Sequence, residues 1–262
     1  MRSRREPILN LPPVVTALIA ILTLLHFALD RLPQGVADEA LALFALVPVR
    51  LSYALAPGAT LRALAESAGD DGGAETLRLL LGDPGGAWLT PLTYGFLHGD
   101  WTHLAVNVLS LAAFGAPVAR RFGDGRFLAF LAVASVSGAA AYVAAHALDA
   151  APVIGASAAI SGTMGAVTRF AFMPGAPLGE RRVGARGDGE AGAGSTPLIE
   201  LASNRRAAFF VVVWFGVNLM VGMFPDTAGV ASAIAWEAHM GGFVAGLLLF
   251  GLFDPAPRRA SE

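Results

Sequence analysis

The sequence predicts an all-α polytopic membrane protein with six transmembrane helices, and three observations support this prediction. First, 55% of the 262 residues are hydrophobic and only 15% are charged, whereas soluble domains carry about 25% charged residues. Second, six apolar stretches are long enough to cross a bilayer, which takes about 20 residues in a helix. Third, the arginines concentrate in alternate connecting segments, as expected for a chain with a fixed orientation in a membrane.

The six predicted spans follow a short basic N-terminal segment. They cover residues 12–30, 100–119, 127–148, 156–173, 207–224 and 233–253. We interpret the first as a retained anchor rather than a signal peptide, because its apolar run is long and no small-x-small cleavage site follows it. The predicted domains are a cytoplasmic N-terminus over 1–11, a membrane domain over 12–253 and a cytoplasmic tail over 254–262.

The distribution of arginine predicts that both termini are cytoplasmic. With the N-terminus inside, the inner segments hold 14 of the 18 arginines, and cytoplasmic segments are the ones that retain positive charge. The remaining arginines lie around the outer loop 31–97, which is too long for its charges to influence the topology. We therefore expect a multi-pass protein of the cell (inner) membrane.

The two long connections have different expected structures. In the outer loop, residues 40–55 and 59–67 are predicted to form short interfacial helices, and the glycine- and aspartate-rich run 69–73 is predicted to form a turn. The inner loop 174–206 is rich in glycine, proline and charge, which favours a linker.

Composition and spacing argue against several classes of site. The chain has no cysteine, which excludes disulfides, thiolate zinc sites and thiol nucleophiles. A net charge of −2 gives no basic surface for nucleic acid. His98 and His103 are five residues apart and do not share a helix face, so we expect no metal and no cofactor. His26 and His146 have no obvious polar neighbours, and we interpret them as structural or interfacial.

Polar side chains that lipid disfavours concentrate near one membrane face. In the predicted orientation, spans two, four and six start at the outer face, and they carry His103, Asn107, Ser157 and His239 near those starts. Asn107, Ser157 and His239 each lie 13–16 residues before the inner end of their span, which is roughly 20–24 Å along a helix. Three helices thus bring polar groups to one depth, and such groups within spans are usually functional.

These side chains fit acyl-transfer chemistry. A serine hydroxyl such as that of Ser157 is a weak nucleophile until a base removes its proton, and a histidine such as His239 removes protons near neutral pH. His103 and Asn107 are four residues apart on one helix face, and both donate hydrogen bonds. Together with the amide of Ser157 at a helix start, they are candidate donors to a developing oxyanion.

Each of these residues also has a structural interpretation. Ser157 fits the preference for serine as an N-cap. His239 fits a hydrogen bond between helices, and His103 and Asn107 fit polar contacts that hold neighbouring helices together.

Small residues at four-residue spacing predict that spans four and six pack closely, because helices without bulky side chains approach tightly in lipid. They are Ala158, Gly162 and Ala166 in span four, and Ala238, Gly242 and Gly246 in span six.

Three segments resemble the motifs of the rhomboid family. They are PLTYGFLHGDWTHLAVN over 91–107, GASAAISG over 155–162 and AHMGGFVAG over 238–246. Their order and spacing also match, and the resemblance covers about residues 88–253. It implies a six-helix bundle and an intramembrane serine endopeptidase that cleaves transmembrane segments of membrane proteins within the lipid bilayer.

The resemblance also implies roles for individual residues. The implied roles are Ser157 as nucleophile, His239 as general base and then acid, His103 and Asn107 as oxyanion donors, and His98 and Gly155 as supporting residues. No aspartate completes a triad, so packing and neighbouring groups must orient His239.

Two positions depart from the family pattern. Ala158 follows the serine where the family usually has glycine, and its methyl group is expected to crowd the oxyanion site or to stiffen the turn. Ser161 occupies the place of an aromatic residue that often stacks on the histidine, so we expect His239 to be held less firmly or by another aromatic ring. Both departures bear on the rate more than on the type of reaction.

Span five carries four aromatic residues, which are Phe209, Phe210, Trp214 and Phe215. The resemblance implies that a substrate helix enters beside this span, while a lipid-facing aromatic surface explains the same residues equally well.

Two other functions compete with proteolysis. A rhomboid-like pseudoprotease would bind membrane proteins without cleaving them, and Ala158 is the feature that favours it. A small transporter or channel would need polar groups through both leaflets, whereas the inner halves of spans two and six are almost wholly apolar.

Overall fold

A computed structural model describes residues 10–68, 81, 84–172, 195–223 and 235–255. In this part of the chain the regular structure is helical, with one isolated bridge between Leu46 and Val153. The elements are α1 (Pro13–Leu29), α2 (Gln34–Phe44), α3 (Pro48–Leu55), α4 (Pro57–Ala68), η1 (Pro84–Leu89), α6 (Thr90–Thr93), η2 (Tyr94–Phe96), α7 (Trp101–Ser110), η3 (Leu111–Gly115), α8 (Ala116–Phe122), α9 (Asp124–Ala145), α10 (Ser157–Thr168), α11 (Leu198–Leu201), α12 (Arg205–Met223) and α13 (Trp236–Phe253).

The all-helical fold is confirmed, and within the described part of the chain four segments are long and apolar enough to cross a membrane. They are Trp101–Phe122, Asp124–Ala145, Arg205–Met223 and Trp236–Phe253. The two other predicted spans coincide with shorter helices, α1 of 17 residues and α10 of 12 residues. The count of six spans therefore stays a prediction.

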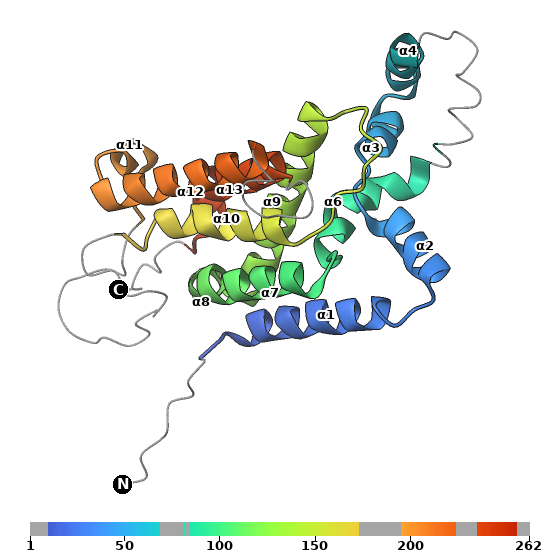
Figure 1. The fold of residues 1–262 in the computed structure, drawn as a ribbon. Coiled ribbons are helices and arrows are strands. Elements are labelled where there is room, and N and C mark those ends of the chain that lie inside the picture. Colours follow the sequence, from blue (N-terminus) through green and yellow to red (C-terminus); the bar gives the residue numbers. More distant parts are fainter. Residues whose placement is uncertain (1–9, 69–80, 82–83, 173–194, 224–234, 256–262) are drawn as a thin grey trace, which may run out of the picture.

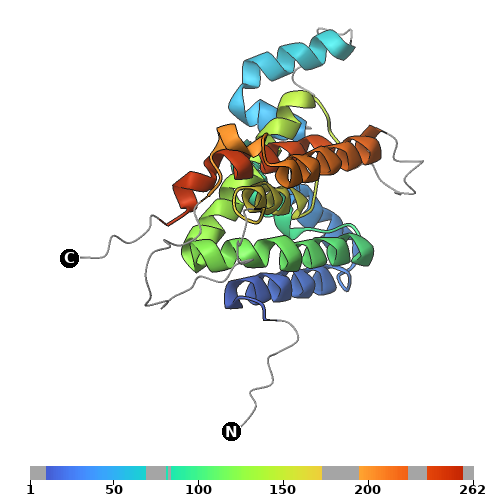
Figure 2. The same ribbon diagram turned by 90° about the vertical axis from the view of Figure 1, so that its left-hand side faces the viewer.

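Helix α10 lies inside the bundle, packed against α9 and α13. Nine of its 12 residues are buried, whereas Ala207 is the one buried residue among the 19 of α12. Non-helical backbone at membrane depth is tolerated where protein buries it, so a helix inside the bundle can be shorter than one that faces lipid. In Figures 1 and 2, α1 runs alongside the segment formed by α7 and α8 at one edge of the bundle.

The packing of α10 against α13 depends on glycine, as the small-residue spacing predicted. A Cβ atom at Gly246 would lie 1.9 Å from the carbonyl oxygen of Gly162, and one at Gly242 would lie 2.0 Å from that of Ala158. No side chain fits in these contacts, so the two backbones approach each other directly. This approach brings the first turn of α13 beside the first turn of α10.

The long helix from Trp101 to Phe122 contains a π-helical turn over Leu111–Gly115. Pro117 follows this turn. Proline lacks an N–H group, and its ring collides with the carbonyl four residues earlier, so a regular α-helix is disrupted there. The predicted span is thus a single helix with a local distortion.

Helices α2, α3 and α4 gather at one end of the bundle (Figure 1). Leu46 and Val153 exchange two backbone hydrogen bonds of 3.0 and 2.8 Å, and the amide of Val49 donates to the carbonyl of Asp149. The prediction of one helix over 40–55 was therefore wrong: α2 ends at Phe44 because Leu46 pairs with another segment, and α3 restarts at Pro48.

The other predictions for the connections have mixed outcomes. Residues 59–67 lie within α4, as expected. In the inner loop 174–206, the described part contains α11 and the first two residues of α12, so this part is more ordered than a linker. The turn over 69–73 and the rest of that loop lie outside the described residues.

An ion pair closes the opposite end of the bundle. The guanidinium of Arg121 donates two hydrogen bonds of 2.7 and 2.9 Å to the carboxylate of Asp254. Nearby, Arg169 donates to the backbone carbonyls of Thr196 and Leu247. These contacts join α8, α10 and the end of α13.

Candidate active site

Ser157 and His239 lie in hydrogen-bonding contact although 82 residues separate them in the sequence. Oγ of Ser157 lies 2.7 Å from Nε2 of His239. Ser157 is the first residue of α10, and the N-cap position before it is occupied by Ala156. The N-cap interpretation of Ser157 is therefore wrong, because Ser157 lies one position inside the helix and its hydroxyl contacts His239 of α13.

His239 lies in the first turn of α13, and its second ring nitrogen also has a partner. Nδ1 of His239 lies 2.8 Å from Oδ1 of Asn218, which belongs to α12. Among the described residues, no aromatic ring is paired with the imidazole of His239. The second neighbour of His239 is thus an amide and not an aromatic ring. His239 bridges Ser157 and Asn218.

Gly155 makes room for His103. Its φ angle is +122°, a conformation that residues with a Cβ atom rarely adopt. A Cβ atom at this position would lie 2.7 Å from Nε2 of His103 and 3.7 Å from Oγ of Ser157. The backbone is held there by a 2.9 Å hydrogen bond from the Gly155 amide to the carbonyl of Tyr94. Gly155 therefore lies between the nucleophile candidate and one predicted oxyanion donor.

A backbone hydrogen bond orients the imidazole of His103. The amide of Gly99 donates to Nδ1 at 3.4 Å. In a neutral imidazole, one nitrogen accepts and the other carries the proton. Nε2, which faces Gly155, then carries the proton and acts as a donor, as an oxyanion contact requires.

The side chain of Asp100 caps α7 just before His103. Its carboxylate accepts a 2.8 Å hydrogen bond from the His103 amide. This bond holds the pKa of the Asp100 carboxyl below its ordinary value of 3.8. The start of the helix that carries the predicted oxyanion donors is thus fixed by an anionic cap.

Asn107 lies one turn after His103 and is buried. Its Nδ2 donates a 3.0 Å hydrogen bond to the carbonyl of His103. An amide nitrogen carries two hydrogens, so this bond uses one of its two donor positions. The predicted face shared by His103 and Asn107 exists on α7.

His98 packs between two other histidine rings. Its ring centroid lies 5.0 Å from that of His103 and 6.5 Å from that of His26, both in edge-to-face geometry. Within the described part of the chain, Nε2 of His26 is buried and has no protein hydrogen-bond partner. His26 is thus buried beside the site, in keeping with a structural role.

His146 has polar neighbours, which contradicts the interpretation that it has none. Its Nε2 lies 2.9 Å from Oε1 of Glu237, and its Nδ1 lies 3.2 Å from Oδ2 of Asp149. The ring of Tyr142 stacks on the imidazole at 4.5 Å. Glu237 lies 91 residues away in the sequence, so this contact between the end of α9 and the start of α13 is a product of folding.

The methyl group of Ala158 packs between helices. Ala158 is 1% exposed and belongs to a buried cluster with Ala139 and Ala238. A Cβ atom at Gly138 of α9 would lie 2.6 Å from the Cβ atom of Ala158. The methyl group at the departure from the family pattern therefore faces α9.

The aromatic residues of α12 attach that helix to the bundle. Trp214 stacks on Phe243 of α13 with a centroid distance of 4.2 Å, and Phe215 packs edge-on against the same ring at 5.3 Å. Phe210 contacts Phe172 at 5.4 Å. Phe209 is 71% exposed and faces outward. Trp214, Phe210 and Phe215 thus attach α12 to the bundle, whereas Phe209 points away from it.

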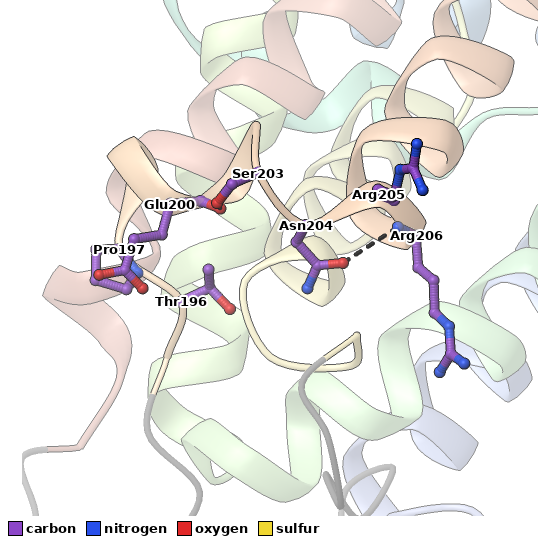
Figure 3. Close-up of a pocket in the computed structure, with 7 residues that line it drawn as sticks. All are labelled: Thr196, Pro197, Glu200, Ser203, Asn204, Arg205 and Arg206. Atoms are coloured by element: carbon purple, nitrogen blue, oxygen red, sulfur yellow. Dashed lines mark hydrogen bonds between the residues drawn. The ribbon is translucent and has the colours of Figure 1, made fainter.

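A hollow visible in Figure 3 lies at a different place in the fold, around α11 and the start of α12. Thr196, Pro197, Glu200, Ser203, Asn204, Arg205 and Arg206 line it. It contains none of the predicted site residues. Asn204 there caps α12, since its Oδ1 accepts from the amides of Arg206 and Ala207.

Asn218 is absent from the site residues predicted from the sequence. A signal was available, because an asparagine in an otherwise apolar span is costly and usually has a partner. The prediction for span five used its aromatic residues alone. The partner of Asn218 is visible once α12 and α13 are packed together.

The fold and the site define the class: an all-helical membrane protein in which a serine and a histidine from separate helices share a hydrogen bond. The rhomboid domain family model matches residues 85–254, more than half of the chain. The chain therefore belongs to the rhomboid family.

The chain is also similar to a curated protein, rhomboid protease GluP of Bacillus subtilis (strain 168). The two are 39% identical over 87 residues, which is 33% of this chain and 17% of that protein. The chain thus matches about one sixth of the length of its relative.

Proposed function

We propose that this protein is an intramembrane serine endopeptidase that cleaves transmembrane segments of membrane proteins. The observation that carries the proposal is the 2.7 Å contact between Oγ of Ser157 and Nε2 of His239. Membership of the rhomboid family and the similarity to a rhomboid protease support it. Ser157, His239, His103 and Asn107 take the roles that the resemblance implies.

In the first half of the reaction, Oγ of Ser157 attacks the carbonyl carbon of the scissile peptide bond while its proton passes to Nε2 of His239. His103 and Asn107 donate hydrogen bonds to the oxyanion that forms on the carbonyl oxygen. The carbon–nitrogen bond then breaks, and the proton on Nε2 goes to the departing amine. An ester between the substrate and Ser157 remains.

In the second half, water attacks the ester carbon and gives a proton to Nε2 of His239. The bond from carbon to Oγ breaks, the proton returns to Oγ, and the new carboxylic acid leaves. Atoms and charges balance without a metal or another cofactor. A lipid-buried site needs its water at this step, so the position of the site near one face of the membrane suits the reaction.

The test is covalent labelling with a fluorophosphonate probe, alongside cleavage of a reporter transmembrane segment in liposomes. We expect Ser157→Ala and His239→Ala to abolish both signals, with a loss of about 10⁴-fold or more for the serine. Ser161→Ala is the matched control, because Ser161 is a second buried serine on the same helix, and it should keep both signals.

Labelling that persists in Ser157→Ala would contradict the proposal. A folded wild-type protein that is neither labelled nor able to cleave, yet retains a membrane protein on a column, would favour the pseudoprotease.

We further propose six spans with both termini in the cytoplasm of the cell membrane, as the arginine distribution favours. The chain has no cysteine, so single cysteines report topology without background. Asp124→Cys should be protected from a membrane-impermeant maleimide in intact cells, and Ala150→Cys should react. The reverse pattern would overturn this orientation.

A further inference from the structure

We infer that Asn218 is a positioning residue that holds His239 in the tautomer and orientation needed to accept the proton of Ser157. The inference rests on the proposed function and adds a residue to the site that neither the motifs nor the family resemblance includes. In a catalytic triad a third residue orients the histidine. Here the side-chain amide of Asn218, on a third helix, has that role.

The hydrogen bonds of the Asn218 amide determine which of its atoms faces the histidine. Nδ2 donates a 2.9 Å hydrogen bond to the carbonyl of Trp214, one turn earlier in α12. A carbonyl accepts and never donates, so the group placed there must be the NH₂ end of the amide. Oδ1 is consequently the atom that lies 2.8 Å from Nδ1 of His239.

This orientation sets the tautomer of the neutral imidazole. Oδ1 is an acceptor, so Nδ1 of His239 must carry the proton. Nε2 then has a lone pair, and it points at Oγ of Ser157, 2.7 Å away. The opposite tautomer would place a proton between Nε2 and the serine and would leave Nδ1 facing the lone pairs of Oδ1.

The same contact serves the charged state. When Nε2 takes the serine proton, the imidazole becomes a cation whose Nδ1–H points at the negative end of the amide dipole. Hydrogen bonds with one charged partner are stronger than neutral ones, so Asn218 stabilises the state that forms during the reaction. An asparagine holds the catalytic histidine of papain-like proteases in the same manner.

The neighbours of Asn218 fix its position in the bundle. Trp214 donates from Nε1 to the sulfur of Met164 on α10 at 3.0 Å, and its ring stacks on Phe243 of α13 at 4.2 Å. These contacts join α12 to both helices of the Ser157–His239 pair, one turn away from Asn218. Ser161 stands where the family often has an aromatic residue, and Asn218 supplies the support for His239 instead.

The test compares Asn218→Leu, Asn218→Asp and Val217→Ala with the full-length protein in liposomes. Leucine has a similar size and no acceptor, so we expect kcat to fall about 10- to 100-fold, the worth of one hydrogen bond to a charged group, with KM within twofold. Aspartate keeps the acceptor toward His239 but loses the donor to the Trp214 carbonyl, so part of the activity should return. Its carboxylate favours the imidazolium, so the acid limb of the pH profile should move to higher pH. Val217→Ala, on the exposed side of the same helix, should match the wild type.

A second readout does not depend on turnover. The chain has five histidines, and nitrogen-15 NMR of histidine-labelled protein identifies the one lost in His239→Ala. We expect this residue to be protonated at Nδ1 in the wild type and to lose that preference in Asn218→Leu. A wild-type kcat, pH profile and NMR signal in folded Asn218→Leu would overturn the inference. If instead Ser157→Ala cleaved like the wild type, the proposed function would fail, while the NMR comparison would still decide the contact of Asn218 with His239.

Discussion

Gly155 lies against the imidazole of His103, so closely that a Cβ atom on Gly155 would lie 2.7 Å from Nε2 and 2.9 Å from Cε1 of that ring. The glycine adopts φ +122° at the entrance to α10, two residues before Ser157. The shape of the site between the serine and the predicted oxyanion donor therefore depends on a residue without a side chain.

Gly155→Ala tests this dependence. The added methyl group must displace His103 or shift the backbone that carries Ser157. Removal of one oxyanion donor typically costs about 10²–10³ in kcat, so we expect a loss of this size, measured by cleavage of the reporter segment. Gly125→Ala is the control, because a Cβ atom there meets nothing within 4 Å. Equal kcat values for the two variants would contradict the assignment of His103.

Gly246→Ala tests the close packing of α10 and α13. A Cβ atom at Gly246 would lie 1.9 Å from the carbonyl oxygen of Gly162, and backbone cannot move aside as a flexible side chain does. Overpacking costs about 1–3 kcal/mol, which exceeds the gain of up to ~1 kcal/mol from replacing glycine in a helix. The thermal unfolding temperature in detergent should therefore fall. Gly251→Ala, on the same helix in open space, should leave that temperature unchanged or raise it.

Ala158→Gly addresses the departure from the family pattern. The methyl group of Ala158 faces Gly138 of α9, so its removal should leave kcat within about threefold while stability falls by about 1–2 kcal/mol, from the lost methyl burial and the lower helix propensity of glycine. Ala166→Gly, at a buried position of the same helix, should show a similar loss of stability. A rise in kcat of tenfold or more in Ala158→Gly alone would show that the methyl group crowds the oxyanion site.

The carboxylate of Asp100, at the start of α7, makes the stability of the folded state depend on pH. The pKa of its carboxyl is lowered in the folded protein by the hydrogen bond from the His103 amide. The ionised cap therefore stabilises the folded state fully above pH 3.8, the ordinary pKa, and loses this effect as the pH falls through the lower folded pKa.

The unfolding temperatures of wild type and Asp100→Asn, measured between pH 3 and 7, should differ at neutral pH and converge in acid. Asp38→Asn, at an exposed position of α2, should follow the wild type throughout. A constant difference between wild type and Asp100→Asn would show that the charge of Asp100 adds nothing to its hydrogen bond.

Local patterns were sufficient for the helices and insufficient for their boundaries. The apolar runs predicted a helix at every expected span, because a segment in lipid must pair its backbone polar groups with one another, and a helix does so within the segment. The break between α2 and α3 was missed, since it depends on the pairing of Leu46 with Val153 across more than 100 residues. The short length of α10 was also missed. It depends on the helices packed around α10 and could not be predicted from the residues of that segment.

The sequence alone determined the class of the protein and the residue types that could react. Composition, apolar runs and polar residues at one depth indicated a membrane protein with Ser157, His239, His103 and Asn107 at a common level. The tertiary structure decided which atoms meet: Nε2 of His239 faces Ser157, and Nδ1 faces Asn218. The physical reason is the range of each effect. Hydropathy is a property of a segment, whereas a hydrogen bond between α12 and α13 depends on the rotation and separation of two helices, which the packing of the whole bundle sets.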